Sequence, residues 1–98
     1  MKAVYKEPGM APEIIDVGNS LTALQHMVHG YIECVTLMTD AVLICNKEGR
    51  INNMHFNIQF CVMQLFGPIL IVGRDGDEFC DLPEPEWWLE QIGGAANG

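Results

Sequence analysis

The chain offers few residues that could carry out catalysis. His26 and His29 lie three positions apart, a helical spacing that can serve a metal ion, but no H-E-x-x-H pattern surrounds them and no third ligand follows nearby. Ser20 is the only serine, and no G-x-S-x-G sequence surrounds it. Glu33 and Asp40 could form a carboxylate pair, but their spacing does not establish that they meet. We therefore expect no enzymatic activity, no metal and no cofactor.

The cysteines predict buried, reduced thiols. Cys34, Cys45, Cys61 and Cys80 stand far apart, and three of them lie in apolar runs. They form no C-x₂₋₄-C pair that could anchor a structural zinc ion. The N-terminal sequence MKAVYKEPGM lacks the apolar core of a signal peptide, so we expect a cytosolic protein without disulfides.

The polar stretch CNKEGRINNMHFN, residues 45–57, separates two strongly apolar segments and is the best candidate for a binding site. Its first part, residues 46–49, predicts a β-turn with Asn first and Gly fourth. A minimal hairpin would not need the amides that follow the turn. Amides can read base edges and ribose hydroxyls, and arginine can pair with a phosphate. The predicted ligand-binding residues are Asn46, Arg50, Asn52, Asn53 and Asn57.

The charge distribution is strongly acidic and uneven. Thirteen acidic residues and five basic ones give a net charge of −8, and no base follows Arg74. The acids after that point are Asp75, Asp77, Glu78, Asp81, Glu84, Glu86 and Glu90. A field of this sign repels phosphate backbones, which argues against direct binding of nucleic acid. Two interpretations remain open: a solvated acidic surface, or a mimic of nucleic-acid charge that occupies a basic cleft on another protein.

Composition predicts one α+β domain over residues 1–92 and a flexible tail over 93–98. Hydrophobic residues make up 49% of the chain, which excludes intrinsic disorder. No apolar run approaches the roughly 20 residues that a membrane-spanning helix needs, so we expect no membrane insertion.

Hydrophobic patterning predicts the elements of this domain. The main helix covers about 20–29, capped by Asn19 or Ser20, with Leu21, Leu24, Met27 and Val28 on its apolar face. Short strands are expected over 1–6, 13–18, 31–38, 41–45, 67–73 and 78–82. Residues 56–66 fit either period, and we expect an irregular or short helical segment there. The predicted architecture is a small twisted antiparallel or mixed sheet of five to six strands with its helices on one face.

A short C-terminal helix over residues 86–92 contains the adjacent pair Trp87 and Trp88. Neighbouring helical residues point in different directions, so we expect one ring in the core and the other near the surface. The pair then serves either as a latch that docks the final helix or as an aromatic anchor for a ligand or partner.

Four segments together resemble a known family. They are LQHMVHGYIECVTL (24–37), AVLICNKEG (41–49), Asn57 and GPILIVG (67–73). The family is an uncharacterised small-protein domain of bacteriophages, plasmids and other bacterial mobile elements, whose members read "LQ..V.GYIE", "NEEG", an asparagine and "G...IVG" in this order. The resemblance covers about half the chain, which departs from the pattern at Lys47 and His29. It implies a mobile-element origin, no established enzymatic activity and the cytoplasm of a bacterial host.

This setting suggests two functions. The first is a non-enzymatic anti-defence protein, built as a homo-oligomer, that sequesters a small nucleotide-derived signalling molecule. The alternative is an acidic inhibitor that binds a host defence protein by nucleic-acid charge mimicry.

Overall fold

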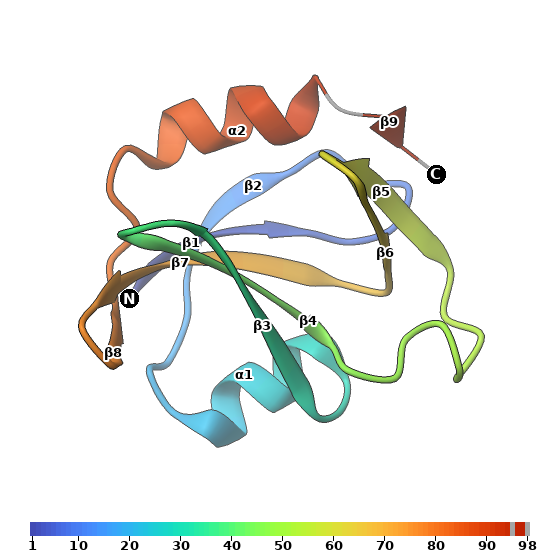
Figure 1. Cartoon of the computed structure of the whole chain (residues 1–98), viewed down its shortest axis with the longest axis horizontal. Coiled ribbons are helices and arrows are strands. Elements are labelled where there is room, and N and C mark those ends of the chain that lie inside the picture. Colours follow the sequence, from blue (N-terminus) through green and yellow to red (C-terminus); the bar gives the residue numbers. More distant parts are fainter. Residues whose placement is uncertain (95, 98) are drawn as a thin grey trace.

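The computed structural model describes residues 1–94, 96 and 97, and its elements follow the predicted α+β pattern (Figure 1). In chain order they are β1 (Lys2–Lys6), β2 (Glu13–Asp16), α1 (Leu21–Val28), β3 (Ile32–Met38), β4 (Ala41–Asn46), β5 (Phe56–Phe60), β6 (Met63–Phe66), β7 (Ile69–Asp75), β8 (Glu78–Cys80), α2 (Pro85–Gly93) and β9 (Ala96–Asn97). The predicted tail, 93–98, includes Ala95 and Gly98, which lie outside the described residues.

The main sheet is antiparallel throughout. Its strands lie in the order β2-β1-β7-β4-β3, and β8 pairs with the end of β7 to make a six-stranded sheet. The apolar runs of β4 and β7 pair at its centre, with Val42 opposite Val72. Strands β6, β5 and β9 form a second, smaller sheet. The predicted class and the five to six strands of the main sheet are confirmed.

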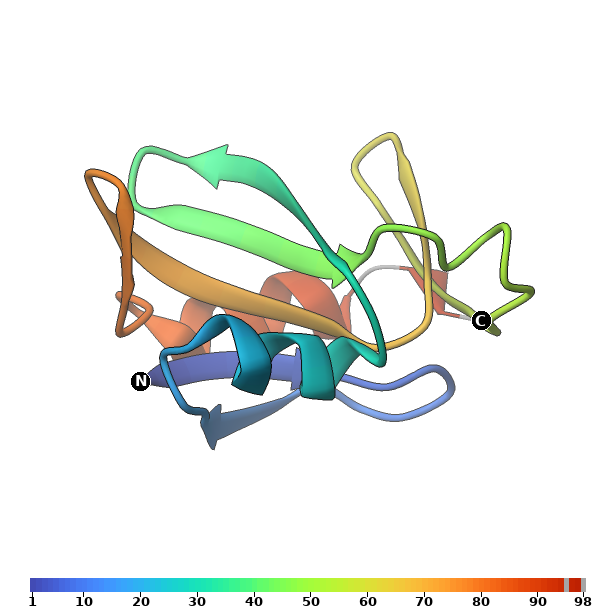
Figure 2. The same ribbon diagram turned by 90° about the horizontal axis from the view of Figure 1, so that it is seen from below.

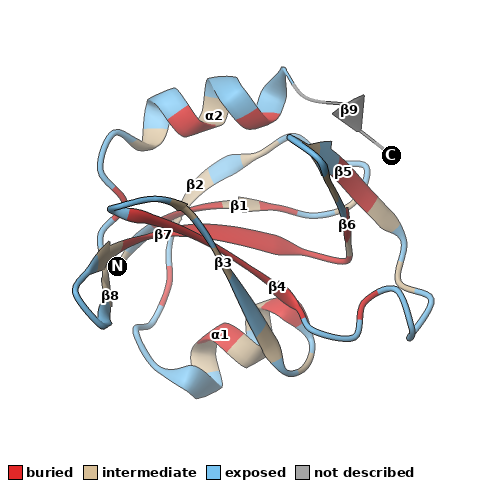
Figure 3. Cartoon of the chain, viewed as in Figure 1, coloured by how far each residue is buried: buried red, intermediate tan, exposed pale blue. Residues whose placement is uncertain are grey.

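The two helices cover opposite faces of the main sheet, so the expectation that they share one face is wrong (Figure 3). Leu24 and Val28 of α1 pack on one face, and Trp88 and Ile92 of α2 pack on the other. The reason lies in β4, which is buried at all six positions. A central strand that is apolar on both sides needs a cover on both sides.

Residues 56–66 form the β5–β6 hairpin, which corrects the expectation of an irregular or helical segment. Ile58 and Leu65 are buried and join the core beneath α2. The register shifts between Phe56 and Ile58, so Asn57 and Ile58 are both buried. This irregularity interrupts the alternation that identifies a strand in a sequence.

Helix α1 confirms the predicted helix, and its ends explain its length. The Ser20 hydroxyl oxygen accepts a hydrogen bond of 3.1 Å from the Ala23 N–H at the start. At the end His29 takes a left-handed conformation (φ 64°), and the Gly30 N–H donates to the Gln25 carbonyl. Leu21, expected on the apolar face, is 58% exposed.

The tryptophans behave as expected, whereas three of the cysteines do not: Cys34 and Cys61 are exposed and Cys80 is half-buried. Trp88 is 5% exposed and Trp87 is 42% exposed. The two rings meet edge-on, with their centres 4.8 Å apart. All four cysteines are free, but only Cys45 is buried. Cys34 and Cys61 are exposed because they lie on an outer strand and in a hairpin turn. Among the described helices, none is long and apolar enough to cross a membrane.

Candidate functional site

Asn57 lies inside the molecule and joins three segments. Its side-chain nitrogen donates to the carbonyls of Lys6 (2.8 Å) and Gly67 (2.7 Å). Its side-chain oxygen accepts a 2.7 Å hydrogen bond from the Lys6 ammonium. The side chain is 0% exposed, and both of its amide N–H groups are used. Asn57 therefore anchors β5 to β1 and to the entry of β7, and it has no group left to offer a ligand.

Lys6 is the partner that sequence reasoning missed. It is 0% exposed, and its ammonium also lies 3.4 Å from the Asn57 carbonyl and 3.3 Å from the Glu7 carbonyl. No carboxylate pairs with it among the residues that the structure describes. Burial lowers the pKa of the Lys6 ammonium. The sequence did indicate the burial of Lys6, because Lys6 is two residues after Val4 and therefore lies on the same side of β1.

Asn46 is a second structural amide. It is 7% exposed, and its nitrogen donates to the Val28 carbonyl at 2.9 Å, in the last turn of α1. Its side-chain oxygen accepts a 2.8 Å hydrogen bond from the Glu48 N–H, and the Gly49 N–H donates to its carbonyl. The predicted turn is confirmed. Asn46 fixes this turn against the helix.

The three remaining predicted residues lie on the exposed loop between these two amides. Arg50 turns toward the β5–β6 hairpin, where it donates to the Gln64 side-chain oxygen at 2.8 Å and stacks 4.8 Å above the Phe66 ring centre. The Asn52 N–H donates to the Glu48 carbonyl at 2.8 Å, which folds the loop back on itself. Asn53 has a φ of 55°, a left-handed conformation that asparagine tolerates.

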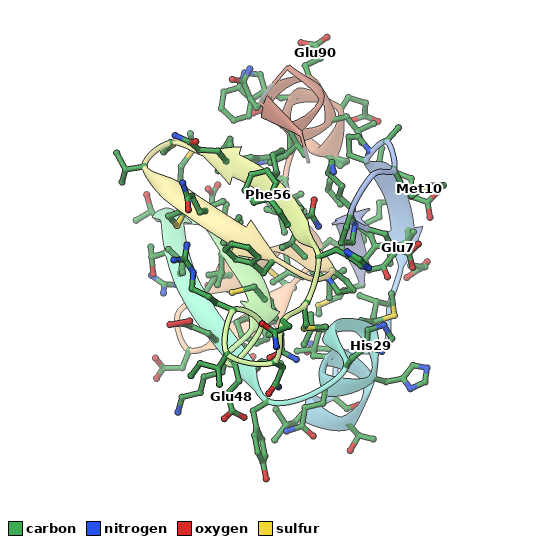
Figure 4. All side chains as sticks on the ribbon, turned by 90° about the vertical axis from the view of Figure 1, so that its right-hand side faces the viewer. Glu7, Met10, His29, Glu48, Phe56 and Glu90 are labelled. Carbon is green, nitrogen blue, oxygen red and sulfur yellow. The ribbon has the colours of Figure 1, made fainter. Side chains whose placement is uncertain are left out.

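A groove of about 700 Å³ lies beside this loop. We call it the α1 groove, because α1, the start of β3 and the residues after β4 form its walls. Its lining residues are Leu21, Gln25, Tyr31, Ile32, Lys47, Glu48 and Ile51. A smaller hollow of about 240 Å³ shares Gln25, Tyr31 and Glu48 with it and adds His29, Gly30, Asn46 and Asn52. Figure 4 shows Glu48 and His29 at the same end of the molecule, beside α1.

Three large apolar side chains stand exposed around the α1 groove. Leu21 is 58% exposed, Tyr31 67% and Ile51 77%. Isolated exposed apolar residues are ordinary, but a group of them around one concavity is typical of a binding surface. Sequence reasoning missed this group because its members come from three separate segments.

The α1 groove combines three kinds of contact. Tyr31 offers an aromatic ring, Gln25 offers an amide, and Lys47 and Glu48 offer opposite charges at its edge. The smaller hollow adds the amide of Asn52. Of the five predicted site residues, Asn46 and Asn52 line the smaller hollow. Arg50 and Asn53 lie on the same loop but are not part of either lining, and Asn57 lies elsewhere in the core.

Comparison with known proteins identifies a family. The model of a family described as a domain of unknown function, DUF3846, matches residues 1–93. No curated protein and no solved structure is significantly similar to the chain.

Proposed function

The chain belongs to the DUF3846 family of domains of unknown function, and from this premise we propose that it is a non-enzymatic binding protein whose ligand lies in the α1 groove. The observation that carries the proposal is the convergence of Leu21, Tyr31 and Ile51, all more than half exposed, on one groove. Leaving this much apolar surface in water is unfavourable, and a bound ligand would remove it from solvent.

A small nucleotide-derived molecule suits the chemistry of this groove. A volume of about 700 Å³ lies within the usual range of about 300–1,000 Å³ for small-molecule sites. The Tyr31 ring offers a stacking surface for a base, and the amide of Gln25, with that of Asn52 in the smaller hollow, can bond to base edges. The Lys47 ammonium can pair with a phosphate, and the Glu48 carboxylate can accept from a ribose hydroxyl or an exocyclic amine.

The proposed biological role is sequestration. We place the protein in the cytoplasm of a bacterial host that carries a phage or another mobile element, where it removes a nucleotide-derived defence signal. A protein that only holds its ligand needs affinity and a suitable groove, and no catalytic group.

Isothermal titration calorimetry with a panel of cyclic and ADP-ribose-type nucleotides tests the proposal. Loss of one base-stacking contact is worth about 1–3 kcal/mol, so Tyr31→Ala should weaken binding by about 5- to 150-fold. Val62→Ala is the matched control, because Val62 is apolar and 95% exposed but lies on the β5–β6 turn away from the groove. The proposal would be refuted if the folded protein bound no nucleotide of the panel, or if Tyr31→Ala bound a nucleotide as tightly as the wild type.

The acidic C-terminal third supports a second candidate, an inhibitor that occupies a basic cleft on a host defence protein. In residues 1–94, 96 and 97 one ion pair is found, between the Met1 ammonium and Asp16 at 3.2 Å, and it involves no acid from residues 75–90. Glu90 points outward from α2 (Figure 4). Asp81 is engaged differently, since its carboxylate accepts a 2.7 Å hydrogen bond from the Lys2 N–H.

The dependence of binding on salt concentration distinguishes the two candidate functions. Charge mimicry predicts a complex that weakens steeply as salt rises and is lost when Asp77, Glu78 and Glu84 are neutralised together. Asp81 is left intact because of its hydrogen bond to the Lys2 main chain. A pulldown from defence-active cells in which the triple variant still captures its protein partner would contradict this candidate, and Tyr31→Ala should leave it unchanged.

A further inference from the structure

We propose that two copies of the chain pair through their β3 strands, antiparallel, with the twofold axis at Cys34. The partner is a second copy, and the pairing joins the two main sheets into one continuous sheet. The inference goes beyond the α1 groove and does not depend on any ligand.

Strand β3 is the outermost strand of the main sheet, and among the described strands it pairs with β4 alone (Figure 2). The Lys47 N–H donates to the Tyr31 carbonyl at 2.8 Å, and the same register continues along the strand up to Thr36. In an antiparallel ladder the direction of the main-chain groups alternates from residue to residue. Tyr31, Glu33 and Val35 therefore bond inward to β4, and the N–H and C=O groups of Ile32, Cys34 and Thr36 point outward.

This edge lacks the features that usually protect an outer strand. Strand β3 has seven residues, with no proline or lysine and with Glu33 as its only charge. The opposite edge, β2, has four residues, begins and ends with an acid, and follows Pro12. Short length, charge and proline are the common means by which proteins prevent strand addition; β2 is short and charged, and a proline directly precedes it. Most of β3 is also exposed (Figure 3).

The sequence of β3 suits pairing with itself. Its register shifts between Thr36 and Met38, so the regular stretch that presents a full edge is 32–36. A twofold axis at Cys34, the centre of this stretch, overlaps all of it and aligns Ile32 with the second copy's Thr36. The three outward-facing residues then exchange about six main-chain hydrogen bonds with their counterparts. Val35, which is only half-buried, gains a neighbour across the new pair.

Charge opposes this pairing, which gives it a distinctive salt response. Each copy carries a net charge of −8, and the axis at Cys34 brings the two Glu33 carboxylates into a diagonal relation of about 7–8 Å. Salt screens both repulsions, so the dimer should become tighter as ionic strength rises. This is opposite to the response expected of a complex formed by charge mimicry. Glu33→Gln should tighten the dimer by about twofold at low salt.

The first test is sedimentation equilibrium of the purified chain over a concentration series at low and high salt. Cys34→Pro replaces an outward N–H with a methylene group and leaves every bond to β4 in place, whereas Cys34→Thr keeps the N–H. The wild type and Cys34→Thr should dimerise, and Cys34→Pro should be monomeric with an unchanged circular dichroism spectrum. A wild type that stays monomeric at every concentration, or a dimer that survives Cys34→Pro, would overturn the proposal.

Disulfide trapping keeps the test decisive if Cys34→Pro fails to fold. Two variants retain one exposed cysteine each, Cys34 or Cys61, with the other exposed cysteine and Cys80 replaced by serine. Directly opposed residues of a hydrogen-bonded pair lie about 5.5 Å apart at Cα, within the range that a disulfide spans. Mild oxidation should give covalent dimers at least tenfold faster through Cys34 than through Cys61. Equal rates would contradict an axis at Cys34.

Discussion

Replacement of Asn57 by alanine should be among the most destabilising single changes in this protein. The side chain is 0% exposed and forms hydrogen bonds of 2.8, 2.7 and 2.7 Å to Lys6 and Gly67. Alanine removes all three bonds and leaves two buried carbonyls and one buried ammonium with fewer partners. Because Asn57 joins β5 to the main sheet, its loss also loosens the contact between the two sheets.

The size of this destabilisation follows from the hydrogen-bond partners of Asn57. A neutral hydrogen bond contributes about 1 kcal/mol net, and a bond to a charged group contributes about 1.5–3 kcal/mol. Two bonds of the first kind and one of the second give a cost of about 3.5–5 kcal/mol. A domain of this size has a total stability of about 5–15 kcal/mol, so the variant should be close to unfolding.

Urea denaturation followed by tryptophan fluorescence measures this cost, since Trp88 is buried in the core and becomes exposed on unfolding. Asn52→Ala is the matched control: the same substitution at an exposed asparagine on the same loop should change the stability by less than about 0.5 kcal/mol. In a Lys6→Met background, Asn57→Ala should cost about 1.5–3 kcal/mol less, because no ammonium is left unpaired. A cost below about 1 kcal/mol in the wild type, or no coupling to Lys6, would refute this account of the core.

Three further predictions concern other buried groups. Because burial holds the pKa of Lys6 below its ordinary value of 10.5, the unfolded chain binds more protons than the folded one just below that pH. The stability of the wild type relative to Lys6→Met should therefore rise from neutral pH toward pH 10.5 in urea titrations; a flat difference would contradict it. Gly73→Ala should lower the midpoint of thermal unfolding, at a cost of about 1–3 kcal/mol, because its Cβ would overlap the main chain after β8. Gly93→Ala is the control and should not, because its Cβ meets nothing within 4 Å among the residues that the structure describes. Burial raises the pKa of Cys45 to about 11, so a thiol reagent should label Cys61 in the native state and Cys45 only after unfolding.

The elements that the sequence predicted correctly are those with a regular pattern. The continuous apolar runs of β4 and β7 indicated central strands, and the cap and stop signals around α1 placed its ends within one residue. The β5–β6 hairpin was missed because its register shift puts Asn57 and Ile58 both inside. Its turn was no clearer, since Cys61 takes a φ of 55° where glycine or asparagine would have been the usual signal.

The candidate site was predictable only in part, because the sequence does not show whether an amide side chain faces a ligand or bonds to the protein's own main chain. Asn46 and Asn57 were selected for their hydrogen-bonding capacity, and the structure uses that capacity internally. The exposure of Tyr31 and Ile51 depends on where three separate segments end relative to one another. Tertiary position decides this, and no local pattern records it.

The loop over residues 46–57 is both connection and candidate site, and its two ends explain how. Asn46 fixes the first end to α1, and Asn57 fixes the other end to β1 and to the entry of β7. The segment between them forms one wall of the α1 groove, through Lys47, Glu48 and Ile51. A wall held at both ends has less conformational freedom to lose when a ligand binds, and preorganisation of this kind strengthens binding without adding a contact. The buried amides therefore contribute to the proposed site by positioning the residues between them, and they do so through hydrogen bonds to the protein's own main chain.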